Sequence, residues 1–259
     1  MSALDRFSLK GKVILLTGGT GLYGRGLTTD LASAGATLVI ASRNAQECER
    51  VADEERRNGG DVVAESYDQG DEGSIGNLRE KILERYGRVD GVVNNSVART
   101  MSSADGSVEE WEASMRINAT GIMLMNRIFG EVLCNLKGGS IVNVGSIQGV
   151  VGPSLSLYEG TESPPPPPDY FFHKAGMVNL TRFYAALFGS SGVRVNCLSP
   201  GGFFNDHTAP FLSRYNANTF LGRMGNKSDL GGSVIFLLSD ASSYVTGVNL
   251  PVDGGYTAH

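Results

Sequence analysis

Residues 12–24, KVILLTGGTGLYG, run from an aliphatic segment through a glycine-rich turn into a sequence of helical character. The segment KVILLT is short and unbroken, as a strand covered on both faces is. Gly18, Gly21 and Gly24 fall at the strand end, the turn and the helix start, where absent side chains let backbone N–H groups approach a pyrophosphate. Such turns also occur for packing reasons alone. Inside an N-terminal strand–helix–strand unit, however, this one favours dinucleotide binding.

Apolar runs of strand length alternate with helix-length segments through most of the chain. After the strand at 12–17, the pattern predicts strands at 36–41, 61–66, 89–94, 140–144, 193–198 and 248–252. Helices are predicted at 45–58, at about 108–135, and around Ile75, Leu78 and Ile82, ending near Gly87. This alternation predicts the α/β class, with a Rossmann-type, doubly wound parallel sheet of about seven strands and helices on both faces. We interpret residues 1–259 as one dinucleotide-binding domain.

Composition excludes several classes of protein. Glycine supplies 35 of the 259 residues, about twice its usual share, but without the three-residue period of collagen. A hydrophobic fraction of 41% with 19% charged residues excludes a disordered chain. The net charge of −5 argues against broad attraction to nucleic acid or to an anionic membrane. We therefore expect a compact soluble domain with neither partner.

The cysteines and the chain start bear on compartment. Cys48, Cys134 and Cys197 are far apart and in no metal-ligand spacing, which predicts no disulfide framework and no metal site, and fits a reducing compartment. The first residues lack the apolar core of a signal peptide. No apolar run approaches the ~20 residues of a membrane helix. We expect a cytoplasmic location.

Five consecutive prolines, Pro164 to Pro168, interrupt the alternation. Neither a helix nor a central strand holds such a run, so residues 155–169 are predicted to form a loop with a stiff polyproline II segment. The loop is an inert surface excursion, a proline-rich docking site or an insertion at the active site. Its position in the chain, described below, favours the active site.

The end of the second strand discriminates between cofactors. An acidic residue there would accept hydrogen bonds from the ribose hydroxyls of NAD, but Ser42 and Arg43 stand there instead. An arginine pairs with a 2′-phosphate, so NADP is favoured over NAD. Arg43 would otherwise stack on adenine or face solvent. Asp68, past the third strand, is either a hydrogen-bond acceptor for the adenine amino group or a turn residue.

Tyr170 and Lys174 are four residues apart at the start of a predicted helix, so their side chains share a face. An ammonium near a phenol favours the ionised form and prepares it for acid–base work near neutral pH. A lone YxxxK pair is common by chance. Ser146 after the fifth strand and Asn118 in the preceding helix strengthen the assignment.

Taken together, these motifs resemble the short-chain dehydrogenase/reductase family of single-domain enzymes, from Gly11 to Tyr256. The resemblance rests on TGGTGLYG at 17–24, Asp68, NNSV at 94–97, Asn118, Ser146, YFFHK at 170–174, SPGG at 199–202 and VTGVNLPVDGGYT at 245–257.

The resemblance implies roles for these residues. Tyr170 would be the general acid/base, Lys174 would support it and bind the nicotinamide ribose, and Ser146 would hold the substrate oxygen. Asn118 would hold a water that links Lys174 to solvent. The implied cofactor-binding residues are Gly18, Thr20, Gly21, Leu22, Tyr23, Gly24, Ser42, Arg43, Asp68, Asn94, Ser96, Tyr170, Lys174, Pro200, Gly201, Phe203 and Asn205. The implied substrate-binding residues are Ser146, Gln148, Glu159, Tyr170, Gly202 and His207, although His207 and its neighbour Asp206 could equally face solvent.

The chain also departs from the family pattern. Leu22 replaces a usual glycine, NNSV replaces NNAG, Asn205 replaces a threonine, and Ser146 and Tyr170 are unusually far apart. The extra residues are the proline-rich loop, which we expect to be a rigid polar lid. Within it Ser156, Glu159, Thr161 and Glu162 offer hydrogen bonds, and Tyr158 cannot form a YxxxK pair because residue 162 is glutamate. His173 is expected to be a packing residue.

These features predict an NAD(P)-dependent oxidoreductase that interconverts a secondary alcohol and a ketone on a sugar, sugar acid or polyol in carbohydrate metabolism. A dehydrogenase of cyclic or aromatic alcohols and a non-catalytic dinucleotide-binding regulator are the alternatives. We expect a homotetramer or homodimer.

Overall fold

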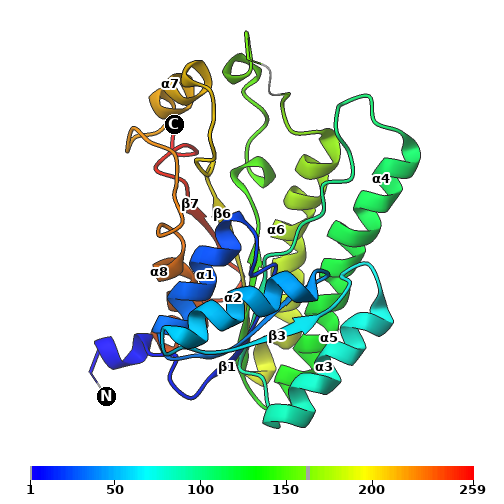
Figure 1. Ribbon diagram of the computed structural model, residues 1–259, viewed down its shortest axis with the longest axis vertical. Helices are drawn as coiled ribbons and strands as arrows, with labels where there is room; N and C mark the ends of the chain where they lie inside the picture. The colour runs from blue at the N-terminus through cyan, green and yellow to red at the C-terminus, as the bar shows by residue number, and fades with distance from the viewer. Residues whose placement is uncertain (1, 162–163) are drawn as a thin grey trace.

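The computed structural model describes residues 2–161 and 164–259 and contains a seven-stranded sheet in the order β3-β2-β1-β4-β5-β6-β7 (Figure 1). The strands are β1 Val13–Thr17, β2 Thr37–Ser42, β3 Asp61–Ser66, β4 Gly91–Asn94, β5 Gly139–Val144, β6 Val193–Pro200 and β7 Asn249–Val252. Every neighbouring pair in this sheet is parallel. The predicted doubly wound α/β fold is confirmed.

The helices cover both faces of the sheet (Figure 1). They are α1 Leu22–Ser33, α2 Ala45–Arg57, α3 Glu72–Tyr86, α4 Val108–Ser114, α5 Gly121–Asn135, α6 Pro168–Phe188, α7 Ala209–Ala217 and α8 Gly231–Leu238. A π-helical segment, Met115–Thr120, joins α4 to α5. Side-chain caps start several helices: Asn44 begins α2, Asp71 begins α3, and Ser107 and Glu110 form a capping box at α4. Among the described residues, no helix combines the length and apolar character needed to cross a bilayer.

Two hydrophobic cores explain why the strands read as unbroken aliphatic runs. Leu15 of β1 packs into the core shared with α3, α5 and α6, whereas Ile14 and Leu16 pack into the core shared with α1, α2 and α8. Successive side chains of a strand point to opposite faces, so a strand covered on both faces must be apolar throughout. All three side chains are fully buried.

The order reverses between β2-β1 and β4-β5, so the crossovers leave the sheet in opposite directions from its centre. Ligands of open parallel sheets bind at such a switch point, beyond the carboxyl ends of the strands. Gly18 and Asn95 follow β1 and β4 at this place.

The prediction for residues 155–169 is wrong at its end. Helix α6 begins at Pro168, and Asp169 is its second residue. Proline fits the first turn of a helix because its missing N–H has no partner there, so the last proline starts α6. Glu162 lies outside the described residues.

Above the carboxyl ends of the strands lies a third, smaller hydrophobic cluster. It consists of Leu157, Phe211, Tyr215 and Met224, with Tyr158, Leu212 and Tyr256 packed against it. We call this set the roof cluster. Arg214 of α7 fastens the proline-rich loop to it, donating to the carbonyl oxygens of Ser156 at 3.1 Å and of Glu159 at 2.5 Å.

Candidate active site

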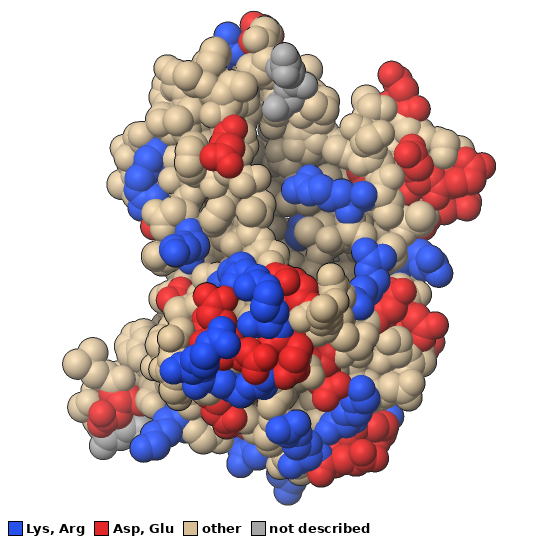
Figure 2. Space-filling view, in the orientation of Figure 1, with Lys and Arg blue, Asp and Glu red and all other residues tan. Residues whose placement is uncertain are grey.

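A pocket of about 730 Å³ opens above the carboxyl ends of the central strands, beneath the roof cluster. Figure 2 shows the surface hollowed between two lobes, with Lys or Arg side chains beside the hollow. The pocket is lined from the glycine turn after β1, through the segment after β4, to the first turns of α6 and the segment after β6.

The glycine turn has the close approach that the sequence predicts. A Cβ on Gly24 would lie 1.9 Å from the carbonyl oxygen of Gly18. Gly18 itself has a φ of 66°, and the amide nitrogen of Gly21 donates to its carbonyl at 3.1 Å. Only glycine lets the start of α1 pass this close to the turn. The result is a side-chain-free cradle at a helix N-terminus, which suits a phosphate group.

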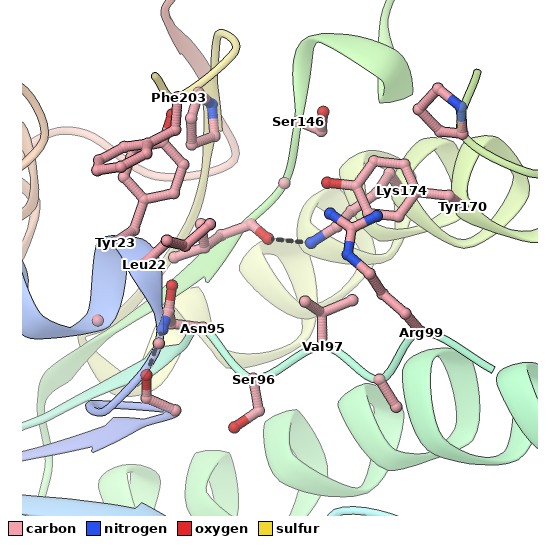
Figure 3. A pocket seen from close by; sticks show the side chains of 18 of the residues that line it. Leu22, Tyr23, Asn95, Ser96, Val97, Arg99, Ser146, Tyr170, Lys174 and Phe203 are labelled. Atoms are coloured by element: carbon pink, nitrogen blue, oxygen red, sulfur yellow. Dashed lines mark hydrogen bonds between the residues drawn. The ribbon is translucent and has the colours of Figure 1, made fainter. Parts of the chain in front are cut away.

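Asn95 fastens the cradle to the strand beside it. Its Nδ2 donates to the carbonyl oxygens of Thr17 and Gly18, both at 3.1 Å (Figure 3). The backbone nitrogens of Asn95 and Ser96 donate to Thr17 Oγ1. Asn94, predicted to contact cofactor, instead lies buried beneath the pocket with its Nδ2 on Asn143 Oδ1 at 2.8 Å. Sequence reasoning thus missed Asn95, the second letter of the same motif.

Ser42, Arg43 and Asp68, predicted to contact the cofactor, line the pocket beyond the ends of β2 and β3. Arg43 is exposed and forms no ion pair with a carboxylate of the described residues. Asp68 Oδ1 accepts a hydrogen bond from the amide of Gly70 at 2.8 Å, so this side chain also shapes its own turn. The arrangement can accept a 2′-phosphate at Arg43.

Tyr170 and Lys174 project from the first turns of α6 into the pocket, and Figure 3 shows the hydroxyl groups of Tyr170 and Ser146 facing the same space. Lys174 Nζ lies 5.7 Å from the centroid of the Tyr170 ring and donates to the carbonyl oxygen of Val144 at 2.6 Å. Burial lowers the pKa of Lys174. Ser146 Oγ accepts a hydrogen bond from the amide of Gln148 at 3.1 Å, which fixes the hydroxyl at the end of β5.

Asn118 lies behind this group, not among the residues that line the pocket. It occupies the π-helical segment and is buried, and its side chain pairs with both backbone groups of Ala98 at 2.8 Å. Its Nδ2 also donates to Ser114 Oγ, which donates to Asp169 beside Tyr170. π-Helical turns are frequent at functional sites. The assigned water-holding role of Asn118 stays a prediction.

The segment after β6 forms the remaining wall. Tyr23 donates from its hydroxyl to the carbonyl oxygen of Gly201 at 2.7 Å, and its ring meets that of Phe203 edge-on. The amide of Gly202 donates to the hydroxyl of Tyr215 at 2.5 Å. Other predicted residues that line the pocket are Leu22, Tyr23, Gln148, Pro200, Gly201, Gly202, Phe203, Asn205 and His207.

Three placements differ from the sequence reasoning. Glu159 is exposed and not among the lining residues, because its backbone is drawn to Arg214. Tyr158 lines the pocket as a packing residue against Phe211. Arg99, which no motif marked, also lines it, and its only sequence signal is a place two residues beyond NNSV.

His173 and the three cysteines are not among the described residues that line the pocket. His173 is buried, and its ring meets that of Tyr170 edge-on at 5.3 Å. Burial, with the charges of Lys174 and Arg99, lowers its pKa to about 3, so it is neutral at physiological pH. The cysteines are free thiols. Among the described residues, no three metal-ligating side chains form a cluster.

Comparisons with known proteins identify which proteins are similar to this chain. The family model described as enoyl-(acyl carrier protein) reductase matches residues 23–257. The chain is similar to the cyclopentanol dehydrogenase of Comamonas testosteroni, at 34% identity over 96% of this chain and 98% of that protein. It is also similar to the D-threitol dehydrogenase of Mycolicibacterium smegmatis, at 30% identity over 97% and 95%.

A gluconate 5-dehydrogenase of Burkholderia cenocepacia, solved in complex with NADP and tartrate, superposes with a TM-score of 0.89 at 29% identity, covering 100% of both chains. One family accounts for the fold, the glycine cradle, the Ser146–Tyr170–Lys174 group and the similarity to these proteins. The chain belongs to the short-chain dehydrogenase/reductase family, whose members bind NAD(P) and act as oxidoreductases on CH–OH groups.

Proposed function

We propose that the protein interconverts a secondary alcohol and a ketone on a polar small molecule, a sugar, sugar acid or polyol, with a preference for NADP. The observation that carries the proposal is the shared space in front of the Ser146 and Tyr170 hydroxyl groups, backed by a buried lysine. Two donors converging on one point suit a reacting oxygen.

Tyr170 is the general acid/base. In the reductive direction its hydroxyl donates a proton to the forming alkoxide, and in the oxidative direction it accepts the proton from the alcohol. Ser146 donates a hydrogen bond to the same oxygen and fixes the orientation of the substrate. Because Ser146 directly follows β5 and Tyr170 lies on α6, both groups are positioned by regular elements before the substrate binds.

Lys174 supports Tyr170 electrostatically. It is held in place by Val144, so its charge lies at a fixed distance from the phenol. A nearby ammonium stabilises the phenolate relative to the phenol, which eases proton transfer. Asn118 is a positioning residue, since it braces the backbone of Ala98 beside the pocket.

The described residues fit a nicotinamide dinucleotide. The cradle of Gly18, Gly21 and Gly24 would hold the pyrophosphate, Arg43 a 2′-phosphate and Asp68 the adenine, while Gly201 would lie beside the nicotinamide. The chemistry that the cofactor supplies when bound is hydride exchange with the carbon that bears the reacting oxygen. The preference for NADP rests on Arg43, which no carboxylate of the described residues neutralises.

The polar substrate is supported by Gln148 and His207 in the pocket wall. Two of the similar proteins are a threitol and a gluconate dehydrogenase, and the latter was solved with NADP. A cyclic alcohol is the second candidate. It is favoured by the aromatic side chains of Tyr158 and Phe211 above the pocket and by the similarity to a cyclopentanol dehydrogenase.

The test is a crossed screen of NADP and NAD against sugar acids, polyols and cyclic alcohols, read by the absorbance of the reduced cofactor. We expect turnover of a polyol or sugar acid with NADP, and a loss of about 100-fold or more in Tyr170→Phe with NADPH binding retained. Turnover of cyclic alcohols alone selects the second candidate. Unchanged turnover in Tyr170→Phe contradicts the mechanism.

We also propose a cytoplasmic homotetramer or homodimer that acts in carbohydrate metabolism. Phe172, Phe183 and Leu187 are exposed on α6. Spaced by multiples of about one helical turn, they form an apolar stripe that a second copy would cover. Light scattering of the purified protein tests the oligomer, and a monomeric mass contradicts it.

A further inference from the structure

The pocket has the opposite charge balance from the whole chain. The protein carries a net charge of −5. The described residues that line the pocket, however, include three cationic side chains, Arg43, Arg99 and Lys174, and one carboxylate, Asp68. An excess of fixed positive charge in a cleft concentrates anionic ligands there.

The three cations lie at different places. Arg43 follows β2, next to the turn of Asp68, and would meet the adenosine half of the cofactor. Lys174 is buried, and its Nζ donates a hydrogen bond to the carbonyl oxygen of Val144. Arg99 follows β4 and lies at the catalytic end, with its Cζ 5.2 Å from the centroid of the Tyr170 ring. Figure 3 shows the guanidinium of Arg99 beside Tyr170 and Lys174. A cofactor phosphate at Arg43 therefore leaves Arg99 free.

Among the described residues, the ring of Tyr170 is the contact of the Arg99 guanidinium that the structure shows, and no carboxylate pairs with its charge. Arg99 forms no hydrogen bond and no ion pair with any described residue, and its side chain is exposed to the pocket mouth. A guanidinium carries five N–H donors in a planar fork that matches a carboxylate with two parallel hydrogen bonds. The contact with the Tyr170 ring places this fork at the catalytic end of the pocket.

Arg99 and Lys174 bring two positive charges to the same end of the pocket, both beside the ring of Tyr170. Burial lowers the pKa of Lys174, and the charge of Arg99 lowers it further. Like charges placed together in the protein raise the energy of the empty pocket. A bound anion relieves this repulsion, so the placement favours ligands that bring negative charge to the substrate end.

We propose that Arg99 binds a carboxylate of the substrate, which makes the substrate a hydroxy acid or the matching oxo acid. The inference rests on the proposed function, because Tyr170 marks the reacting oxygen from which the carboxylate lies only a few bonds away. Of the candidate classes above, the geometry selects sugar acids over polyols and cyclic alcohols. Arg99 is a specificity-determining residue that touches the carboxylate and leaves proton transfer to Tyr170.

The first experiment compares D-gluconate with D-glucitol, which differ only in the terminal carboxylate. Arg99→Met removes the charge while keeping a long side chain, Arg99→Lys restores a point charge, and Arg57→Met removes an exposed arginine on α2 as a matched control. We expect Arg99→Met to lower kcat/KM for the acid by about 10- to 100-fold, mainly through KM. The value for glucitol and the affinity for NADPH should stay within about two-fold in every variant. Arg99→Lys should recover part of the loss.

A second experiment separates this inference from the proposed function. In a Tyr170→Phe background, calorimetry measures binding of gluconate and of glucitol to the protein saturated with NADP⁺, with and without Arg99→Met. Binding of gluconate that depends on Arg99 supports the anchor even if the wild type turns over neither compound, in which case only the proposed function fails. An equal effect of Arg99→Met on acid and polyol, or no binding of gluconate, overturns the anchor.

Discussion

Gly24→Ala is the substitution whose effect the structure fixes most closely. The added Cβ would lie 1.9 Å from the Gly18 carbonyl oxygen, whereas ordinary contact begins at 3.4 Å, a shortfall of 1.5 Å. Its next neighbours, at 2.9 Å, are the carbonyl carbons of Gly18 and Gly19, so only backbone movement relieves the clash. The Gly18 carbonyl also accepts hydrogen bonds from Gly21 and Asn95, which movement would break.

Overpacking of this kind costs about 1–3 kcal/mol of unfolding free energy. For a chain of this size that lowers Tm by about 2–4 °C per kcal/mol. The shifted turn also misplaces the backbone donors of the phosphate cradle. Because a hydrogen bond to a charged group contributes about 1.5–3 kcal/mol, we expect the Kd for NADPH to rise at least about ten-fold.

Urea unfolding and titration of NADPH fluorescence measure the two effects. Gly76→Ala in α3 is the control, since no atom of the described residues outside its own stretch of helix lies within 4 Å of an added Cβ. It should stabilise the fold by about 0.5–1 kcal/mol and leave the Kd unchanged. Wild-type stability and NADPH affinity in Gly24→Ala would refute the assignment of a tight, phosphate-binding turn.

Other predictions use the same purified protein. Arg43→Gln should raise KM for NADP about 10- to 100-fold and leave KM for NAD nearly unchanged; equal effects on both cofactors argue against a 2′-phosphate contact. Tyr215→Phe leaves the Gly202 amide without its acceptor and should cost about 1–3 kcal/mol in urea unfolding. His173 has a pKa of about 3 when folded against an ordinary 6.5, so the unfolded chain binds more protons between these values and stability falls as pH falls. At pH 5 the loss of stability amounts to about 2 kcal/mol. The unfolding free energy measured with urea should therefore fall between pH 7 and pH 5 by about 2 kcal/mol less in His173→Leu than in the wild type. An identical fall in both proteins excludes His173 as its source.

The sequence predicts the sheet well because its central strands, such as β1 and β4, are buried on both faces and are therefore apolar throughout. The strand at 61–66 and the turn after 12–17 are found where the aliphatic pattern places them. The strand ends are predicted less well. The strand predicted at 89–94 begins at Gly91, and the strand predicted at 193–198 extends to Pro200. These limits depend on pairing with neighbouring strands, which a single segment does not encode. The π-helical segment at Met115–Thr120 likewise has no periodicity that distinguishes it from the long helix around it.

In the candidate site, too, some placements follow from the sequence and others do not. Residues fixed by backbone geometry, such as Gly24 and Tyr170, lie at the pocket as predicted. Side chains on irregular segments do not follow from spacing. Glu159 is drawn away by Arg214, and Arg99 enters the pocket from a loop whose path the sequence does not specify. The roles assigned to individual residues stay predictions until the variants above are measured.

The roof cluster has a consequence for the evolution of specificity. Its four buried members, Leu157, Phe211, Tyr215 and Met224, form a hydrophobic cluster separate from the two cores that hold the sheet. Changes at sites without shared contacts add nearly independently. Substitutions in the roof cluster can therefore change the wall above the substrate during evolution. The two cores of the sheet and the geometry of the proton-transfer group would stay as they are. A combinatorial library at Leu157, Phe211 and Met224, which keeps Tyr215 and its hydrogen bond to the Gly202 amide, would vary this cluster without changing either core of the sheet.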